Sequence, residues 1–147
     1  MRKQQFYTAS KVKHAPLWRK MRAKGYAITA TWIDEAGEGD TSNYAELAER
    51  CLQDIKAADF LLLYCKPGQL LKGALIEAGM ALALGKEVRC VGNCRTISRV
   101  FKSHPLWTRH RNILAAVNAE PANDPSSPTG GPAVSPCNND VPPARSV

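Results

Sequence analysis

Short apolar runs and longer amphipathic stretches alternate along this chain as far as residue 92. The apolar, β-branched and aromatic runs predict four strands, at 5–9, 26–33, 60–65 and 87–92. Apolar side chains at helical spacing predict three helices, at 15–25, 43–58 and 71–86. Gly25 and Gly85 are expected to end the first and third helix, and Thr41 or Ser42 to cap the second. A basic, partly aromatic segment at 104–111 predicts a final helix.

The order of these elements indicates the fold class. A βαβαβαβ alternation implies a mostly parallel sheet covered by helices on both faces. We therefore expect an α/β, flavodoxin- or Rossmann-like three-layer sandwich. Ligands of such sheets bind beyond the carboxyl ends of the strands, which here are the loops after Ala9, Ile33, Cys65 and Gly92.

The composition changes at residue 118. Residues 118–147 are dense in Pro, Ser, Gly and Asn and contain few residues able to build a core, which predicts a disordered tail. The residues before them have the length of one packed domain. We expect an α/β domain over 1–117 and a tail over 118–147.

Charge and cysteine usage narrow the function classes. The 147-residue chain has a formal net charge of +7, which favours an anionic partner such as a nucleotide. Nucleic acid is a less favoured partner, because the basic residues near the N-terminus form no groove-reading motif. With no membrane-spanning run and no signal-peptide core, a cytoplasmic location is expected. The five cysteines form no CxxC pair, so we expect reduced thiols, no bound metal and no cofactor.

Glu77 is the one acid in the first half of a helix that is otherwise almost entirely apolar. A buried carboxylate without a partner is costly, so this one finds a donor, reaches solvent through a cleft or serves a reaction. Its neighbours one turn away are Gly73, Ala74, Met80 and Ala81, and none is polar. A narrow solvent-facing stripe explains the same spacing, so both interpretations stay open on the residues alone.

The segment "ADFLLLYCKPGQLLKGALIEAGMALALGKEV" and the opening "FYTASK" resemble the nucleoside 2-deoxyribosyltransferase family, including its relatives that hydrolyse deoxynucleoside monophosphates. The resemblance spans roughly residues 6–92. It rests on a strand-opening aspartate and a helix of the form G-x-x-x-E-x-G-x-A-x-x-x-G-K, represented here by Asp59, Gly73, Glu77, Gly79, Ala81, Gly85 and Lys86. The resemblance implies that Glu77 attacks the anomeric carbon of a nucleoside or nucleotide and expels the base, by transfer or hydrolysis through a covalent glycosyl-enzyme.

The second acid of that family is not matched. Counted back from Asp59, its position is held by Cys51. Asp54 lies three residues on, nearly one helical turn away, and is predicted to protonate the departing base. An ordinary surface acid beside Lys56 explains the same letters. Members of the family often assemble so that a neighbouring subunit completes the site, which makes a homo-oligomer a second source of the acid.

Further residues are predicted to bind the substrate. Tyr7 and Ser10 end the first strand, where the family has a loop around the sugar and phosphate. Ser10, Lys11, Lys13 and His14 suit a 5′-phosphate, although a solvated helix start explains them equally.

Trp32 could stack on a nucleobase and Asp34 could bond a ribosyl hydroxyl or an exocyclic amine, whereas a core tryptophan with a capping aspartate explains the same residues. The resemblance adds Asp59 and Gly73 to the expected substrate site. Two alternative functions stay open: a TIR-like NAD glycohydrolase, and a non-catalytic nucleotide-binding module that has lost the second acid.

Overall fold

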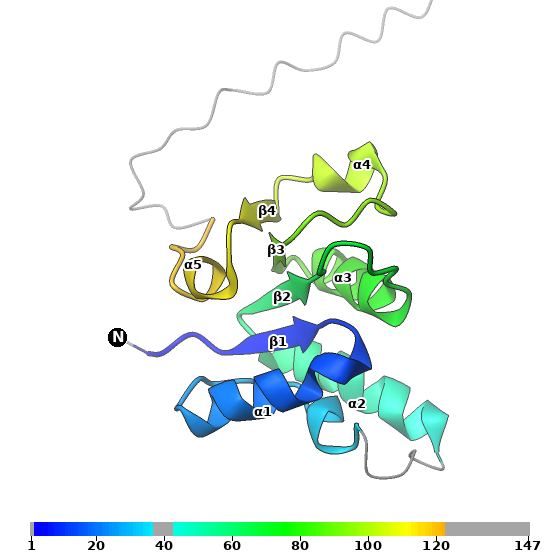
Figure 1. The fold of residues 1–147 in the computed structure, drawn as a ribbon, viewed down its shortest axis with the longest axis vertical. Coiled ribbons are helices and arrows are strands. Elements are labelled where there is room, and N and C mark those ends of the chain that lie inside the picture. The colour runs from blue at the N-terminus through cyan, green and yellow to red at the C-terminus, as the bar shows by residue number, and fades with distance from the viewer. Residues whose placement is uncertain (1, 37–42, 123–147) are drawn as a thin grey trace, which may run out of the picture.

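The computed structural model describes residues 2–36 and 43–122 and has a parallel sheet at its centre (Figure 1). The strands are β1 (Phe6–Ala9), β2 (Phe60–Tyr64), β3 (Glu87–Val91) and β4 (Trp107–His110), and they lie in that order. Every pair of neighbours is parallel. The predicted fold class is therefore confirmed, while residues 123–147 of the predicted tail lie outside the described residues.

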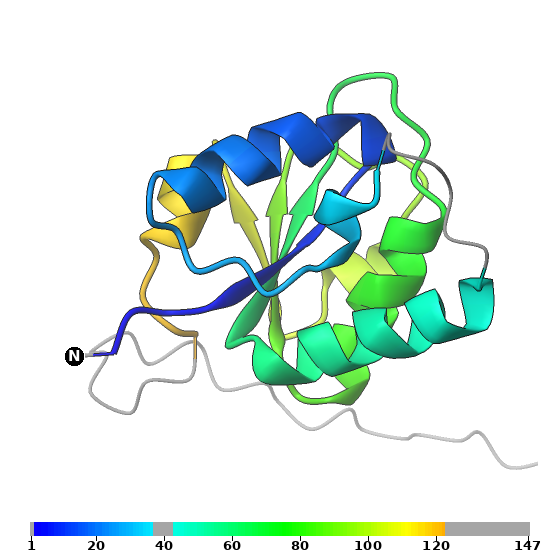
Figure 2. The same ribbon diagram turned by 90° about the horizontal axis from the view of Figure 1, so that it is seen from below.

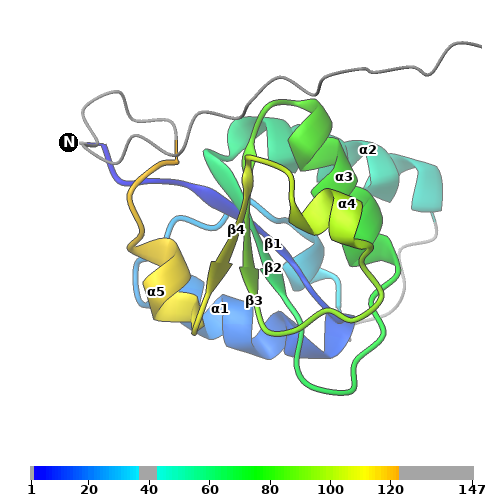
Figure 3. The ribbon, with the colours of Figure 1, turned by 90° about the horizontal axis from the view of Figure 1, so that it is seen from above.

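Helices cover both faces of this sheet. One face carries α1 (Ala15–Ala23) and α5 (Ile113–Val117), and the other carries α2 (Tyr44–Ala57) and α3 (Gly73–Ala83) (Figures 2 and 3). The short α4 (Arg99–Lys102) lies beside α3 and leads into β4. Among the helices described, none combines the length and apolar character needed to cross a membrane.

The core follows from strands that are apolar on both faces. β1 and β3 are buried along their whole length, and so is β2 up to its last residue. Side chains on alternate sides of these strands meet different helices. Tyr7 of β1 faces α2 and α3, whereas Arg89 of β3 faces α5.

The strand predicted at 26–33 is wrong. Within it only Ile28 pairs with the sheet, through an isolated parallel bridge to Phe6, and the chain then forms a 3-10 turn, η2 (Trp32–Asp34). No ladder continues because the Thr31 amide donates to the Asp54 carboxylate at 2.8 Å. The β-branched and aromatic residues of this segment favour a strand locally, but the hydrogen bond from Thr31 to Asp54 on α2 overrides that preference.

The final helix predicted at 104–111 is also wrong, because these residues contain the edge strand β4. Trp107 pairs with Val88 of β3, and its side chain is buried. The Thr108 hydroxyl donates to the Glu87 carboxylate at 2.9 Å, which ties the new edge to the sheet. β4 forms because it pairs with β3 and its side chains contact that strand, and the local hydrophobic pattern does not encode these contacts.

The ends of the predicted helices agree closely with the structure. Gly25 and Gly85 follow α1 and α3 with φ of 95° and 71°, a conformation that favours glycine. α2 begins after Asn43, whose side chain accepts from the Glu46 amide at 3.1 Å. The caps predicted for that helix, Thr41 and Ser42, lie outside the described residues.

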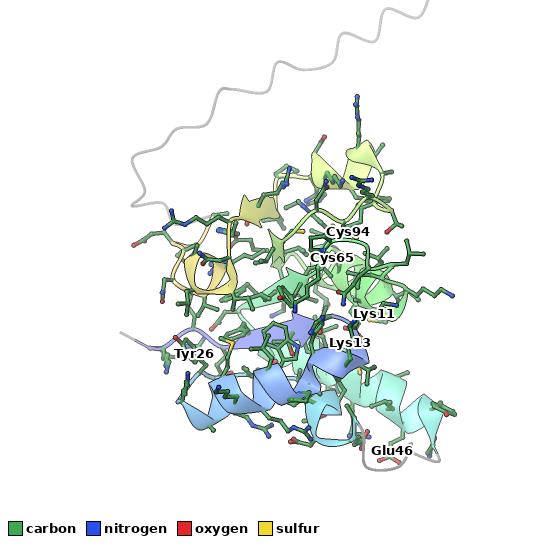
Figure 4. All side chains as sticks on the ribbon, in the orientation of Figure 1. Lys11, Lys13, Tyr26, Glu46, Cys65 and Cys94 are labelled. Carbon is green, nitrogen blue, oxygen red and sulfur yellow. The ribbon has the colours of Figure 1, made fainter. Side chains whose placement is uncertain are left out.

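The loops after β2 and β3 touch each other at the carboxyl end of the sheet. Gly92 has φ of 98°, and a Cβ at that position would lie 1.9 Å from the Cys65 carbonyl oxygen. The thiols of Cys65 and Cys94 lie beside each other there (Figure 4), and burial together with Cys94 raises the pKa of Cys65 to about 11. The four cysteines in the described part of the chain carry free thiols, and Cys137 lies outside it. No cluster of three or more His, Cys, Asp or Glu side chains within the described ranges is arranged to hold a metal ion.

Candidate active site

A pocket of about 310 Å³ opens where the chain leaves the carboxyl ends of β1 and β2. The chain turns towards α1 after β1 and towards α3 after β2, so the two connections leave on opposite faces of the sheet. Doubly wound sheets bind their ligands at such a switch point. The pocket is lined by Ser10, Lys11, Val12, Trp32, Leu47, Cys51, Leu71, Lys72, Gly73, Ala74 and Glu77.

A second hollow, of about 340 Å³, lies between α3 and α4. It is lined mainly by apolar side chains, including Leu75, Phe101 and Trp107, and no ionisable side chain is among its described lining residues. Size alone does not separate the two hollows. The ionisable groups do, and they place the candidate site at the switch point.

Glu77 lines the pocket from the first half of α3. The side chain is half-buried, and among the described residues it has no basic partner in an ion pair. Burial raises the pKa of the Glu77 carboxyl to about 7, and the nearby Tyr7 hydroxyl opposes part of that rise. A carboxylate in this state is divided between its two protonation forms near neutral pH. The solvent-stripe interpretation of Glu77 is therefore not supported.

Tyr7 and Cys51 lie next to that carboxylate. Tyr7 is fully buried in β1, and its hydroxyl has no partner at hydrogen-bonding geometry in the described part of the chain. Burial raises the pKa of Tyr7, and the charge of Glu77 raises it further. Cys51 reaches the pocket from α2, and burial raises the pKa of its thiol as well. A strand and two helices thus bring three ionisable side chains together.

Asp54 has a different position from the one expected of a catalytic acid. It is not among the lining residues, and its carboxylate accepts from the Thr31 amide at 2.8 Å and from the Thr31 hydroxyl at 2.7 Å. These bonds hold the start of η2. Trp32 follows directly, and its indole N–H donates to the Thr8 carbonyl at 2.9 Å, which fixes the ring as a pocket wall. The catalytic role of Asp54 stays a prediction, and the structure gives its carboxylate a positioning contact.

The loop after β1 supplies polar groups to the pocket. The Ser10 hydroxyl accepts from the Trp18 indole at 2.9 Å and donates to the Lys11 carbonyl at 3.0 Å, which holds the loop in place. Lys11 lines the pocket, and Lys72 joins it from the residue before α3. Gly73 begins α3 and lines the same opening. The described lining therefore includes two lysines and one glutamate.

Two residues of the predicted phosphate group do not line the pocket. Lys13 follows Lys11 in the turn η1 (Val12–His14) but is absent from the described lining (Figure 4). His14 is buried, with its ring near the Gln69 amide at 2.9 Å and edge-on to the Tyr64 ring. His14 packs the loop after β2 rather than facing a ligand.

Asp34 and Asp59 lie outside the pocket as well. Asp34 accepts two hydrogen bonds from Arg22, at 2.9 and 2.5 Å, and Arg22 lowers the pKa of this carboxyl. Asp59 accepts from the Gln5 amide at 2.8 Å and pairs with Arg2 at 2.5 Å. Asp59 precedes β2, at the amino edge of the sheet, whereas the pocket lies at the carboxyl edge. Both acids hold local structure.

Sequence reasoning did not single out Val12, Leu47, Leu71 or Lys72 among the lining residues, and two of them, Leu47 and Lys72, have a recognisable signal. Leu47 lies four residues before Cys51 on α2, so the two share one face of the helix. Lys72 directly precedes the helix that carries Glu77. Helical spacing from Cys51, and adjacency to the Glu77 helix, are the signals that could have identified them.

Known proteins resemble this chain in fold rather than in sequence. No protein-family model matches the chain, and no curated protein matches it in sequence. The structure is similar to that of the Clostridium botulinum CMP N-glycosidase BcmB, with a TM-score of 0.47 and 13% identity, over 78% of this chain and 95% of that chain. At this identity and TM-score the likeness describes the fold and assigns no chemistry.

Proposed function

We propose that this protein cleaves the N-glycosidic bond of a nucleoside or nucleotide, with Glu77 as the nucleophile. The observation that carries the proposal is an isolated, half-buried carboxylate in a pocket at the switch point of the sheet, with a pKa of about 7. Asp34 and Asp59 form ion pairs with Arg22 and Arg2, whereas Glu77 pairs with no basic side chain among the described residues. A half-buried carboxylate without a basic partner is available for a reaction.

The reaction has two steps. In the first, a Glu77 carboxylate oxygen forms a bond to the anomeric carbon as the bond to the base nitrogen breaks, and the electron pair leaves with the base. In the second, water or another base attacks the anomeric carbon, the ester bond to Glu77 breaks, and the carboxylate is regenerated. The Tyr7 hydroxyl lies close enough to orient and stabilise the Glu77 carboxylate between these steps.

The remaining lining residues suit the rest of a nucleotide. Lys11 and Lys72 provide ammonium groups for a 5′-phosphate, and Ser10 and Gly73 line the same pocket. The Trp32 ring forms a wall on which a base can stack. These contacts favour a nucleoside monophosphate over an unphosphorylated nucleoside.

The test is release of free base, followed by liquid chromatography. Wild type is incubated with a panel of ribo- and 2′-deoxyribonucleosides, their 5′-monophosphates and NAD, beside Glu77→Gln. We expect base release from at least one member of the panel and a loss of about 10³-fold or more in the variant, because the substitution removes the nucleophile. Glu49→Gln is the matched control, since Glu49 is an exposed helical glutamate on α2 that does not line the pocket.

A folded wild type that releases no base from any member of the panel would contradict the proposal. So would a Glu77→Gln variant that is as active as Glu49→Gln. Circular dichroism and thermal unfolding of each protein establish that the comparison is made between folded states.

A further inference from the structure

The side chains beside Glu77 limit which base can leave this pocket. We propose that the pocket is selective for N-glycosides whose base carries a fixed positive charge on its ring, such as an N-alkylated purine or a pyridinium nucleotide. This inference rests on the proposed function and concerns the substrate class of the same site.

The chemical reason lies in the leaving group. A neutral purine or pyrimidine that departs with the electron pair of the glycosidic bond becomes an anion unless an acid protonates it. A base with a quaternary ring nitrogen accepts the same electron pair and leaves as a neutral molecule. Such a substrate needs a nucleophile and no proton donor.

The groups next to the nucleophile are a thiol and a phenol. Cys51 lines the pocket on α2, and the buried Tyr7 hydroxyl has no hydrogen-bond partner among the described residues. Burial is the main cause that raises the pKa of both groups, so each keeps its proton at neutral pH and is a weak acid towards a departing base. They can donate hydrogen bonds to a sugar oxygen or to Glu77, but they transfer a proton poorly.

The nearest alternative acid is held by another contact. The Asp54 carboxylate accepts both the amide and the hydroxyl of Thr31, at 2.8 and 2.7 Å. Withdrawing it towards the pocket would release two hydrogen bonds and the start of η2. Asp54 therefore helps to position the Trp32 ring that lines the pocket.

The pocket also offers favourable contacts to a cation. Glu77 is the only acid among its described lining residues, and the Trp32 ring is its aromatic wall. A cationic ring is attracted by both a carboxylate and an aromatic face. Lys11 and Lys72 complement the phosphate of the same molecule, so charge of each sign on a cationic nucleotide has a counterpart.

The reaction balances without an added proton. A Glu77 oxygen bonds to the anomeric carbon, the carbon–nitrogen bond breaks, and its electron pair cancels the positive charge of the ring. Water then attacks the anomeric carbon, the glutamyl ester breaks, and one water proton is released to solvent. The products are a neutral base and the sugar phosphate.

The test compares substrates that differ by one methyl group and one charge. 7-Methylguanosine 5′-monophosphate and guanosine 5′-monophosphate are used as a pair, in both the ribose and the 2′-deoxyribose series, and kcat/KM for base release is measured for each. We expect wild type to prefer the methylated nucleotide by at least the ratio of the uncatalysed hydrolysis rates. Comparable values of kcat/KM for the two would overturn the inference, because they would require an efficient proton donor.

Two substitutions at one position sharpen the test. Cys51→Asp introduces a stronger acid beside Glu77 and should lower the preference for the methylated nucleotide by about 10²-fold, mainly by accelerating the neutral one. Cys51→Ser introduces another weak acid and should leave the ratio within about threefold of wild type. A Cys51→Asp ratio equal to that of Cys51→Ser, with both proteins folded, would overturn the inference.

A measurement on wild type alone covers the case in which Cys51→Asp fails to fold. For a series of 5-substituted uridine 5′-monophosphates, whose bases are neutral, kcat/KM should rise steeply as the departing uracil becomes more acidic, because no protonation by the pocket offsets the leaving-group effect. A flat series would overturn the inference. Glu77-dependent release of neutral bases in preference to cationic ones would sink this inference and leave the proposed function intact, whereas release of no base would remove both.

Discussion

Two glutamates on opposite faces of the same sheet, one buried and one half-buried, have contrasting surroundings. Glu87 of β3 forms an ion pair with Arg89 at 3.1 Å and accepts from the Thr108 hydroxyl at 2.9 Å. Glu77 of α3 has no basic partner among the described residues and has a raised pKa of about 7. The Glu87 carboxylate stabilises the fold, whereas the Glu77 carboxylate lines the pocket in which we propose that it reacts.

The Glu87 side is organised around a buried guanidinium. Arg89 is fully buried, donates to the Ala116 carbonyl of α5 at 2.8 Å, and lies 3.7 Å from the centroid of the Phe60 ring. These contacts join β2, β3 and α5. On the pocket side, Tyr7 and Cys51 add neutral groups rather than a cation. The difference teaches that a satisfied buried charge holds the fold, whereas an unsatisfied one in a pocket indicates function.

The largest expected effect comes from breaking the satisfied pair. Glu87→Gln should lower the free energy of unfolding by about 3–5 kcal/mol, because it leaves Arg89 as an uncompensated buried charge. Urea unfolding followed by circular dichroism measures the change. Replacing both partners, as Glu87→Leu with Arg89→Met, should cost clearly less than the sum of the single changes. An additive double variant would mean that the pair is not coupled.

The unsatisfied glutamate should show the opposite behaviour. The pKa of Glu77 rises from about 4.5 to about 7 on folding, so between these values the native state binds a proton that the unfolded chain has lost. Stability contributed by the protonated group is complete below pH 4.5 and is lost as the pH rises through 7.

Glu77→Gln removes this titration. Relative to wild type, it should therefore gain about 2–3 kcal/mol of unfolding free energy between pH 4 and pH 8, the lower value reflecting the carboxylate's partial exposure. Denaturant unfolding at both pH values measures the difference. An equal gap between the two proteins at pH 4 and pH 8 would show that Glu77 titrates normally.

The same pKa sets the acid limb of the activity. A nucleophilic carboxylate must be ionised, so kcat/KM should fall about tenfold for each pH unit below about 7 and level off above it. Initial rates from pH 5 to pH 9 on the preferred nucleotide measure the profile. An acid limb near pH 4.5, the ordinary value for a glutamate, would separate the reaction from the raised pKa of Glu77.

The smallest expected effect concerns Asp54, which, like Glu87, has hydrogen-bond partners. Asp54→Asn weakens the contacts with Thr31 that hold η2 and the Trp32 wall. We expect KM to rise about three- to tenfold while kcat stays within about twofold, since binding is loosened and the chemistry is kept. Steady-state kinetics separate the two constants. A turnover rate lowered about a hundredfold or more, with KM unchanged, would instead make Asp54 the proton donor.

Local sequence determined much of the scaffold. The run 60–65 is apolar on both faces of a strand, and it forms the buried β2 within a parallel sheet. The helix that carries Glu77 and its end at Gly85 also follow from apolar content and glycine. Lys86 closes the same motif, and its ammonium group donates to the Lys56 carbonyl at 2.9 Å and to the Ala58 carbonyl, which ties α3 to the end of α2. The strand, the helix and the helix end depend on neighbours in the chain, so the letters alone predict them, whereas the Lys86 contacts join segments about 30 residues apart.

The tertiary structure decided which acids have hydrogen-bond or ion-pair partners, and it left Glu77 without a basic partner among the described residues. Asp54, Asp59 and Asp34 have similar sequence signals, yet each is engaged by a distant donor, from Thr31, Gln5 and Arg22. The nearness of Tyr7, Cys51 and Glu77 joins residues far apart in the chain. Hydrogen bonding and burial depend on which side chains lie close together in space, and the periodicity of the sequence does not encode those contacts. The sequence by itself determined a parallel α/β scaffold with a glutamate on its third long helix, and only packing decided that this carboxylate lies in the pocket without a cation.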